Sequence, residues 1–89
     1  MPVKTVINQD YIRNIVWEVR TTLNGLNARA GFSPGYIYRL VPESSSQSPI
    51  DVSVSTIDKL HNALEGLMLE RGMNPPDNLW DLLVVHEEI

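Results

Sequence analysis

The sequence predicts an all-α fold, a compact bundle of about five helices, because apolar residues recur at the three- and four-residue spacing of helices through most of the chain. Residues that begin and end helices separate these apolar stretches. At 89 residues with 43% hydrophobic content, the chain is long enough for one core and too short for two. It contains no cysteine, so disulfides do not hold this core together.

The net charge of −4 is distributed unevenly along the chain. The range 1–42 has five basic and two acidic residues, a net charge of +3, whereas the range 43–89 has two basic and nine acidic residues, a net charge of −7. Because contact with phosphates needs only a local cationic face, the overall negative charge does not exclude a nucleic-acid partner.

A first helix is expected over Gln9–Arg20, with Asn8 as its N-cap and an apolar stripe formed by Ile12, Ile15, Val16 and Val19. Trp17 lies away from this stripe, so packing of the helix on the protein core does not account for it. We expect its indole to dock either the C-terminal tail or a partner subunit.

Two short helices follow. The first begins after Thr22 as its cap, covers Leu23–Ala30, and ends at Gly31, since glycine enters the left-handed conformation without steric cost. The second begins with Ser33 as N-cap and Pro34 as its first residue, and it extends to about Val41. Two short helices joined by a tight glycine-containing turn form a helix-turn-helix unit. Its interior is formed by Leu26, Ala30, Phe32, Ile37 and Leu40.

The second half of the chain predicts a loop and two further helices. The polar run Glu43–Ile50 is the loop, and a long helix begins at Ser53 or Ser55 and ends near Gly72, with the role of Gly66 left open. A short last helix is expected after the Asn-Pro-Pro-Asp sequence at 74–77; the alternative is a terminal strand, because residues 84 and 85 are both valine.

The segment Leu26–Leu40 resembles the helix-turn-helix of the Cro/phage-repressor (Xre) family, which reads Leu-Ala-x-x-Ala-Gly-apolar-Ser before a short helix with an inward Ile. Ser53–Leu64 is similar to the helix that packs behind that unit, and the likeness covers about Gln9–Leu67. It implies a lambda-repressor-like DNA-binding domain. The sequence departs from the pattern at Leu23, a position that is often polar, at Asn27, an amide that needs a hydrogen-bond partner at the helix crossing, and in the long loop.

The resemblance implies sequence-specific binding of double-stranded DNA. The leading base-reading positions of the family fall on Pro34 and Gly35, which offer no side-chain donor, so Tyr38 and Arg39 are expected to read bases and Tyr36 to contact phosphate. Asn24 and Arg29 are lower-ranked contacts to the DNA backbone. The full set of DNA-binding candidates is Thr22, Asn24, Ser33, Pro34, Gly35, Tyr36, Tyr38 and Arg39.

The chain is expected to divide into a DNA-binding domain, residues 1–72, and a C-terminal tail, residues 73–89. The tail is expected to be the element through which two copies form a homodimer. A dimer lets a short recognition helix read two half-sites about one helical turn apart. Apolar residues beyond those needed for the helix-turn-helix core predict its surface, namely Trp17, Met68, Leu69, Leu79, Trp80, Leu82 and Leu83. The expected role is a transcriptional regulator, a repressor of phage, prophage or antitoxin type.

Two alternatives keep the same fold. One is a protein-interaction module that reads little DNA, which Pro34, Gly35 and the acidic second half favour. The other is an antitoxin whose tail binds a toxin protein. No nucleophile motif, phosphate-binding glycine loop or zinc spacing occurs, and His61 and His86 lie far apart, so we expect no enzyme, metal or cofactor. The absence of a long apolar run predicts no membrane span and a cytoplasmic protein.

Overall fold

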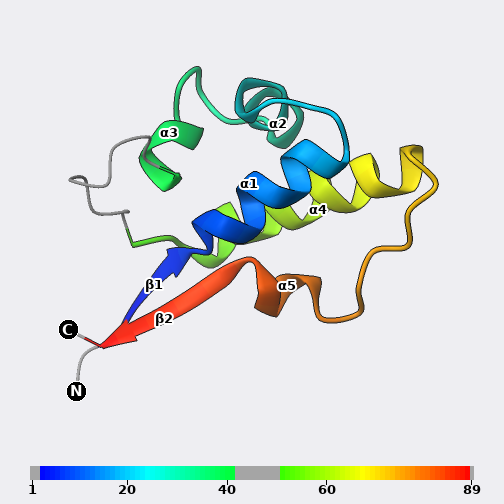
Figure 1. Cartoon of the computed structure of the whole chain (residues 1–89). Coiled ribbons are helices and arrows are strands. Elements are labelled where there is room, and N and C mark those ends of the chain that lie inside the picture. The colour runs from blue at the N-terminus through cyan, green and yellow to red at the C-terminus, as the bar shows by residue number, and fades with distance from the viewer. Residues whose placement is uncertain (1–2, 42–50, 89) are drawn as a thin grey trace.

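The computed structural model describes residues 3–41 and 51–88, which form five helices and one two-stranded sheet. Their order is β1 (Val3–Ile7), α1 (Gln9–Glu18), α2 (Leu23–Ala30), α3 (Ile37–Leu40), α4 (Val54–Glu70), α5 (Leu79–Leu82) and β2 (Val84–Glu88). In Figure 1, α1 and α4 run through the middle of the molecule, α2 and α3 lie above them, and the sheet and α5 lie below.

The prediction of an all-α fold is wrong, because the two ends of the chain pair as an antiparallel sheet. Val6 lies opposite Val85, and Ile7 lies opposite Val84. Both strands contain β-branched residues, which suit a pleated, half-buried surface. The strand considered as an alternative for the tail is present, whereas β1 was not expected. Val6 and Ile7 are buried, so the sheet contributes directly to the core.

The predicted starts of α1 and α2 are confirmed by their caps. The side chain of Asn8 accepts a hydrogen bond from the backbone N–H of Tyr11, and the hydroxyl of Thr22 accepts one from Gly25. α2 ends at Gly31, whose φ of 79° lies in the left-handed region. α1 ends at Glu18, two residues earlier than expected, and the chain turns through Arg20.

The third helix is shorter than predicted, because it begins at Ile37 instead of Pro34. The N–H of Tyr36 donates to the carbonyl of Ser33 (3.0 Å), and Gly35 has a φ of 79°. Proline at the second position and left-handed glycine at the third are typical of a type II β-turn. Pro34 therefore starts a turn, and Ser33 is not the N-cap of a helix. The expected loop over Glu43–Ile50 lies outside the described residues.

α4 begins after Ser53, whose hydroxyl accepts a hydrogen bond from Thr56, so of the two predicted caps Ser53 is the one used. Gly66 is carried within this helix and does not break it. Beyond α4, Leu79 and Leu83 are completely buried. The largest fully buried side chains come from β1, from all five helices and from the residues next to them: Ile7, Ile12, Val19, Leu26, Ile37, Leu40, Val41, Leu60, Leu64, Met68, Leu79 and Leu83.

Candidate nucleic-acid interface

The crossing of α2 and α3 is held by the side chain of Asn27. Its amide nitrogen donates to the carbonyl of Ser33 (3.0 Å), and its amide oxygen accepts from the N–H of Ile37 (2.9 Å). Only 5% of Asn27 is exposed, and it is the one buried polar residue among those that the structure describes. The polar residue that replaces the family's alanine therefore has both partners, and it connects α2 to both ends of the turn.

The turn between α2 and α3 presents its residues to solvent. Ser33, Pro34 and Gly35 are all exposed. Neither Pro34 nor Gly35 carries a polar side chain, so this part of the surface can contribute shape, the hydroxyl of Ser33 and backbone groups to a partner. The backbone carbonyl of Ser33 is already used by Asn27.

The two tyrosines of this region are partly buried. The Tyr36 ring lies 5.0 Å from the Phe32 ring, centroid to centroid, at an angle of 33°, so its face is used within the molecule. Tyr38 also packs against the core, which leaves only part of its side chain accessible. Arg39, in contrast, is exposed. Of the three side chains predicted to contact DNA from this helix, Arg39 is thus the most accessible.

The N-terminal end of α2 also lies at the surface. Thr22 and Asn24 are exposed, and the hydroxyl of Thr22 accepts the capping bond from Gly25. A hydroxyl that accepts one hydrogen bond still has its own hydrogen to donate. Thr22 can therefore cap the helix and donate to a phosphate oxygen at the same time.

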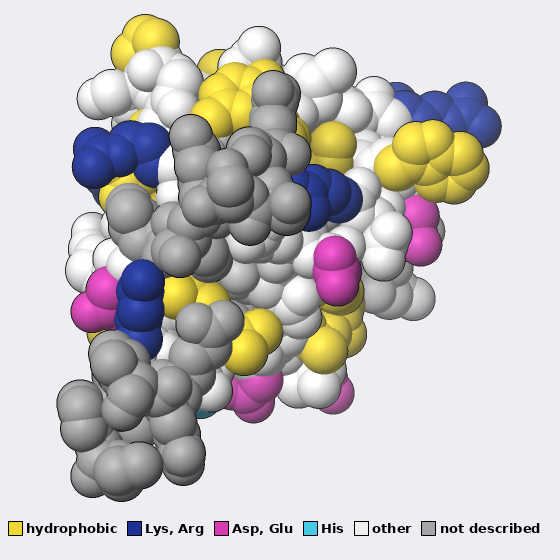
Figure 2. Space-filling view, turned by 60° about the vertical axis from the view of Figure 1, so that its left-hand side comes forward, with side chains coloured by type: hydrophobic (Ala, Val, Ile, Leu, Met, Phe, Trp, Pro, Cys, Tyr) yellow, Lys and Arg dark blue, Asp and Glu magenta, His cyan; other side chains and the backbone are white. Residues whose placement is uncertain are grey.

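Basic side chains are more frequent in the upper part of the face in Figure 2, and acidic side chains lie lower. This view is turned about the vertical axis from Figure 1, so its upper part is at the level of α2 and α3. Arg29 and Arg71 both have partners within the chain. Arg29 forms an ion pair with Glu70, and Nε of Arg71 donates to the carbonyl of Val19 (3.0 Å). The ion pair holds the Arg29 side chain toward α4 and neutralises its charge, so Arg29 is less suited to contact a phosphate.

The residues predicted to form the dimer surface are divided between the core and the exterior. Met68, Leu79 and Leu83 are buried within the single chain, so they cannot face a partner as predicted. Apolar spacing alone does not distinguish a residue of the chain's own core from one of an interface. Leu82 is half-buried, as is Trp80, whose ring lies 6.1 Å from that of His61.

Leu69 and Trp17 are the members of this set that remain exposed, by 58% and 80%. Trp17 does not dock the tail. The predicted tail, residues 73–88 as far as the structure describes it, packs on the rest of the chain through Leu79, Leu83 and the pairing of β2 with β1.

One backbone feature beside this surface was not expected from the sequence. Arg20 has a φ of 56°, in the left-handed region that rarely holds a residue with a side chain. The only sequence signal was the absence of a glycine between two helices that must turn sharply. Within the described residues, no helix has both the length and the apolarity to cross a bilayer. No three metal-binding side chains of those residues form a cluster.

The sequence matches no family model, and no match was found to a curated protein or to a solved structure. The relation to the Cro/phage-repressor family therefore stays a prediction, carried by the residues of α2, the turn and α3.

Proposed function

We propose that the chain is a transcriptional regulator that binds double-stranded DNA through α2, the turn at 33–36 and α3. The observation that carries the proposal is the pair of hydrogen bonds made by Asn27, because they fix the crossing of two short helices while the turn and Arg39 stay exposed. A recognition unit with a fixed crossing presents one preformed surface to a groove. It therefore loses little conformational entropy when it binds.

Contacts with the sugar-phosphate backbone of the DNA dominate the expected mode of binding. Thr22 and Ser33 are exposed before and after α2 and can donate to phosphates, which positions the unit on the duplex. Arg39 is the side chain best placed to read a base edge, since Tyr36 stacks on Phe32. One cation and a partly covered Tyr38 read few bases, so a single copy is expected to discriminate weakly between sequences.

A homodimer would compensate for this weak discrimination, because two copies read two half-sites. Occupation of a promoter by such a dimer would repress transcription. A second candidate is a protein-interaction module on the same fold. The observation that favours it is the length of α3, which is a single turn from Ile37 to Leu40 and so reaches less far into a groove than a full recognition helix.

Binding to random duplex DNA, measured as a function of salt, tests the proposal. For a DNA-binding protein, the logarithm of the binding constant falls linearly with the logarithm of the salt concentration. The slope is roughly −0.9 for each phosphate contact. Selection of bound sequences from a random duplex pool then shows whether binding is specific. Absence of binding at low salt would reject the proposal in favour of the protein-interaction module.

A further inference from the structure

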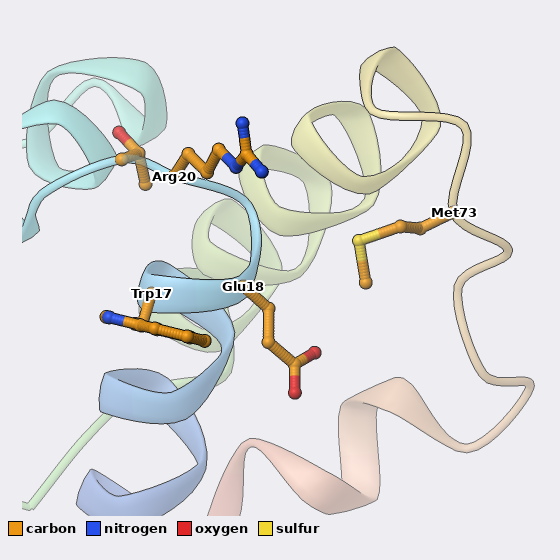
Figure 3. A pocket seen from close by; sticks show the side chains of 5 residues that line it. Trp17, Glu18, Arg20 and Met73 are labelled. Carbon is orange, nitrogen blue, oxygen red and sulfur yellow. The ribbon is translucent and has the colours of Figure 1, made fainter.

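An exposed surface at the C-terminal end of α1 takes no part in the proposed DNA contact. It consists of Trp17, Glu18, Arg20, Thr21 and Met73, which line a hollow of about 630 Å³; we call it the Trp17 face. Figure 3 shows Met73 extending from the segment after α4 toward the end of α1, where Trp17 and Glu18 lie. Trp17 is 80% exposed, more than any other large hydrophobic residue of the described chain.

The backbone holds Arg20 on this face at a conformational cost. The N–H of Arg20 donates to the carbonyl of Trp17 (3.1 Å), and the N–H of Thr21 donates to that of Val16 (3.0 Å). These two bonds form a Schellman motif, whose left-handed position is usually glycine. With a φ of 56°, Arg20 takes that position and keeps a cation three residues after the exposed indole. An unfavourable backbone conformation of this kind is a reason to look for a role of the side chain.

The two sides of the hollow are fixed relative to each other. Nε of Arg71, just after α4, donates to the carbonyl of Val19 at the end of α1 (3.0 Å). Met73 donates its own N–H to the carbonyl of Met68, which holds its backbone against the end of α4 (2.8 Å). A partner therefore meets a surface that is already ordered, which reduces the entropy lost on binding.

We propose that the Trp17 face binds the same face of a second copy of this chain across a two-fold axis. In such a contact every pair of residues occurs twice. If one residue of the first copy touches a second residue of the other copy, the reverse contact is also made. Glu18 of one copy then pairs with Arg20 of the other, and Trp17 packs against Met73 of the other, a favourable contact between sulfur and an aromatic ring.

The charges on the face favour a second copy over a strongly acidic or strongly basic partner. Glu18 and Arg20 carry opposite charges and line the same hollow as Trp17, so a partner of one sign would be repelled by one of them. A two-fold arrangement satisfies both. It also brings together two neutral patches, although two chains of net charge −4 repel one another as a whole.

The contact is small, so the dimer is expected to be weak in free solution. On DNA with two half-sites, binding of the first copy raises the effective concentration of the second, and the same contact becomes sufficient. The proposal is nevertheless tested without DNA, so its failure is distinguishable from a failure of DNA binding.

Charge reversal in two variants provides the sharpest test. Sedimentation equilibrium over a wide concentration range is measured for the wild type, Glu18→Arg, Arg20→Glu and an equimolar mixture of the two variants. Each variant alone places like charges opposite each other and is expected to remain monomeric. The mixture places Arg opposite Glu at both positions, so the dimer is expected to return. Both side chains are exposed, so neither change removes a contact from the core. Glu18→Arg adds a favourable cation near the C-terminal end of α1, whereas Arg20→Glu adds an anion there, a cost within the range of ordinary surface substitutions.

Trp17→Ala removes the largest contact, and we expect the dissociation constant to rise by about 30-fold or more. Val54→Ala is the matched control, since Val54 is 70% exposed at the start of α4, and it should leave the dimer unchanged. In a Trp80→Phe background, the fluorescence of Trp17 should also become protected from quenching as concentration rises. A wild type that stays monomeric, a dimer that survives Trp17→Ala, or a mixture that fails to associate would each overturn the proposal.

Discussion

Asn27 and Ile37 are joined by a hydrogen bond of 2.9 Å in which the buried side-chain oxygen accepts the first backbone N–H of α3. This bond replaces the side-chain cap that α3 lacks. It also explains how a polar residue is accommodated at a helix crossing.

Asn27→Ala is expected to lower the free energy of unfolding by about 1–3 kcal/mol, because the N–H of Ile37 then has no partner inside the protein. Urea denaturation measures the change. Asn24→Ala, at an exposed position of the same helix, is the control and should change stability by less than about 0.5 kcal/mol. Equal effects of the two substitutions would show that the Asn27 bonds contribute nothing.

Gly66 provides the space through which Arg29 reaches Glu70. A Cβ atom at position 66 would lie 3.1 Å from Nη2 of Arg29. Alanine is favoured over glycine in a helix by about 1 kcal/mol, so Gly66→Ala should give less than this gain in the wild type and the full gain in an Arg29→Ala background. Denaturation of the four proteins of this cycle gives the comparison, and identical gains in both backgrounds would contradict it.

Glu70 links the stability of the protein to pH. The hydrogen bond from Arg29, followed by the charges of Arg29 and Arg71, lowers the pKa of Glu70 below its ordinary value. The stabilisation is therefore complete above the ordinary pKa and is lost as the pH falls through the lowered value in the folded state. Glu70→Gln should lose less stability than the wild type on acidification. Asp58→Asn, at an exposed position of α4, is the control and should follow the wild type.

Arg20 offers a gain in stability that is independent of any partner. Arg20→Gly should raise the free energy of unfolding by about 1 kcal/mol, since glycine adopts the left-handed conformation without a Cβ clash. Arg20→Ala retains that clash and should show no gain. If both substitutions stabilise equally, the cost lies in the side chain and not in the backbone.

Arg39→Ala should weaken binding to the selected DNA sequence by about 1–3 kcal/mol and relax preference at one base pair if Arg39 reads a base. Lys59→Ala removes an exposed cation from α4, which is not part of the proposed interface, and should have little effect. A gel-shift or fluorescence titration at fixed salt compares them. An unchanged affinity for Arg39→Ala would remove this residue from the interface.

Local signals in the sequence predicted the caps at Asn8 and Thr22 and the helix end at Gly31, because each depends on residues within one helical turn. The α3 start was missed because Pro34 suits both the first residue of a helix and the second position of a turn; the left-handed Gly35 decides for the turn. Asn27 was predicted to need a hydrogen-bond partner, but the partners themselves follow only from the crossing.

Long-range features could not be predicted in the same way. The prediction for Met68, Leu79 and Leu83 is wrong because periodicity identifies the apolar face of a helix. It does not show whether that face packs on the chain's own core or on a partner. The left-handed Arg20 could not be predicted either, because the absence of a glycine between two helices does not tell which residue takes that conformation.

The pairing of β1 with β2 affects the order in which the protein assembles. Thr5 and His86 are 81 positions apart, and the hydroxyl of Thr5 lies 3.0 Å from Nδ1 of His86. Closing so long a loop is slow and costs entropy, whereas the helices between them depend on near neighbours. During synthesis β1 leaves the ribosome before β2 and cannot pair until the residues between them and β2 itself have been translated. Until then Ile7 lacks its partner Val84, so β1 is an unpaired apolar strand that a nascent chain exposes to aggregation.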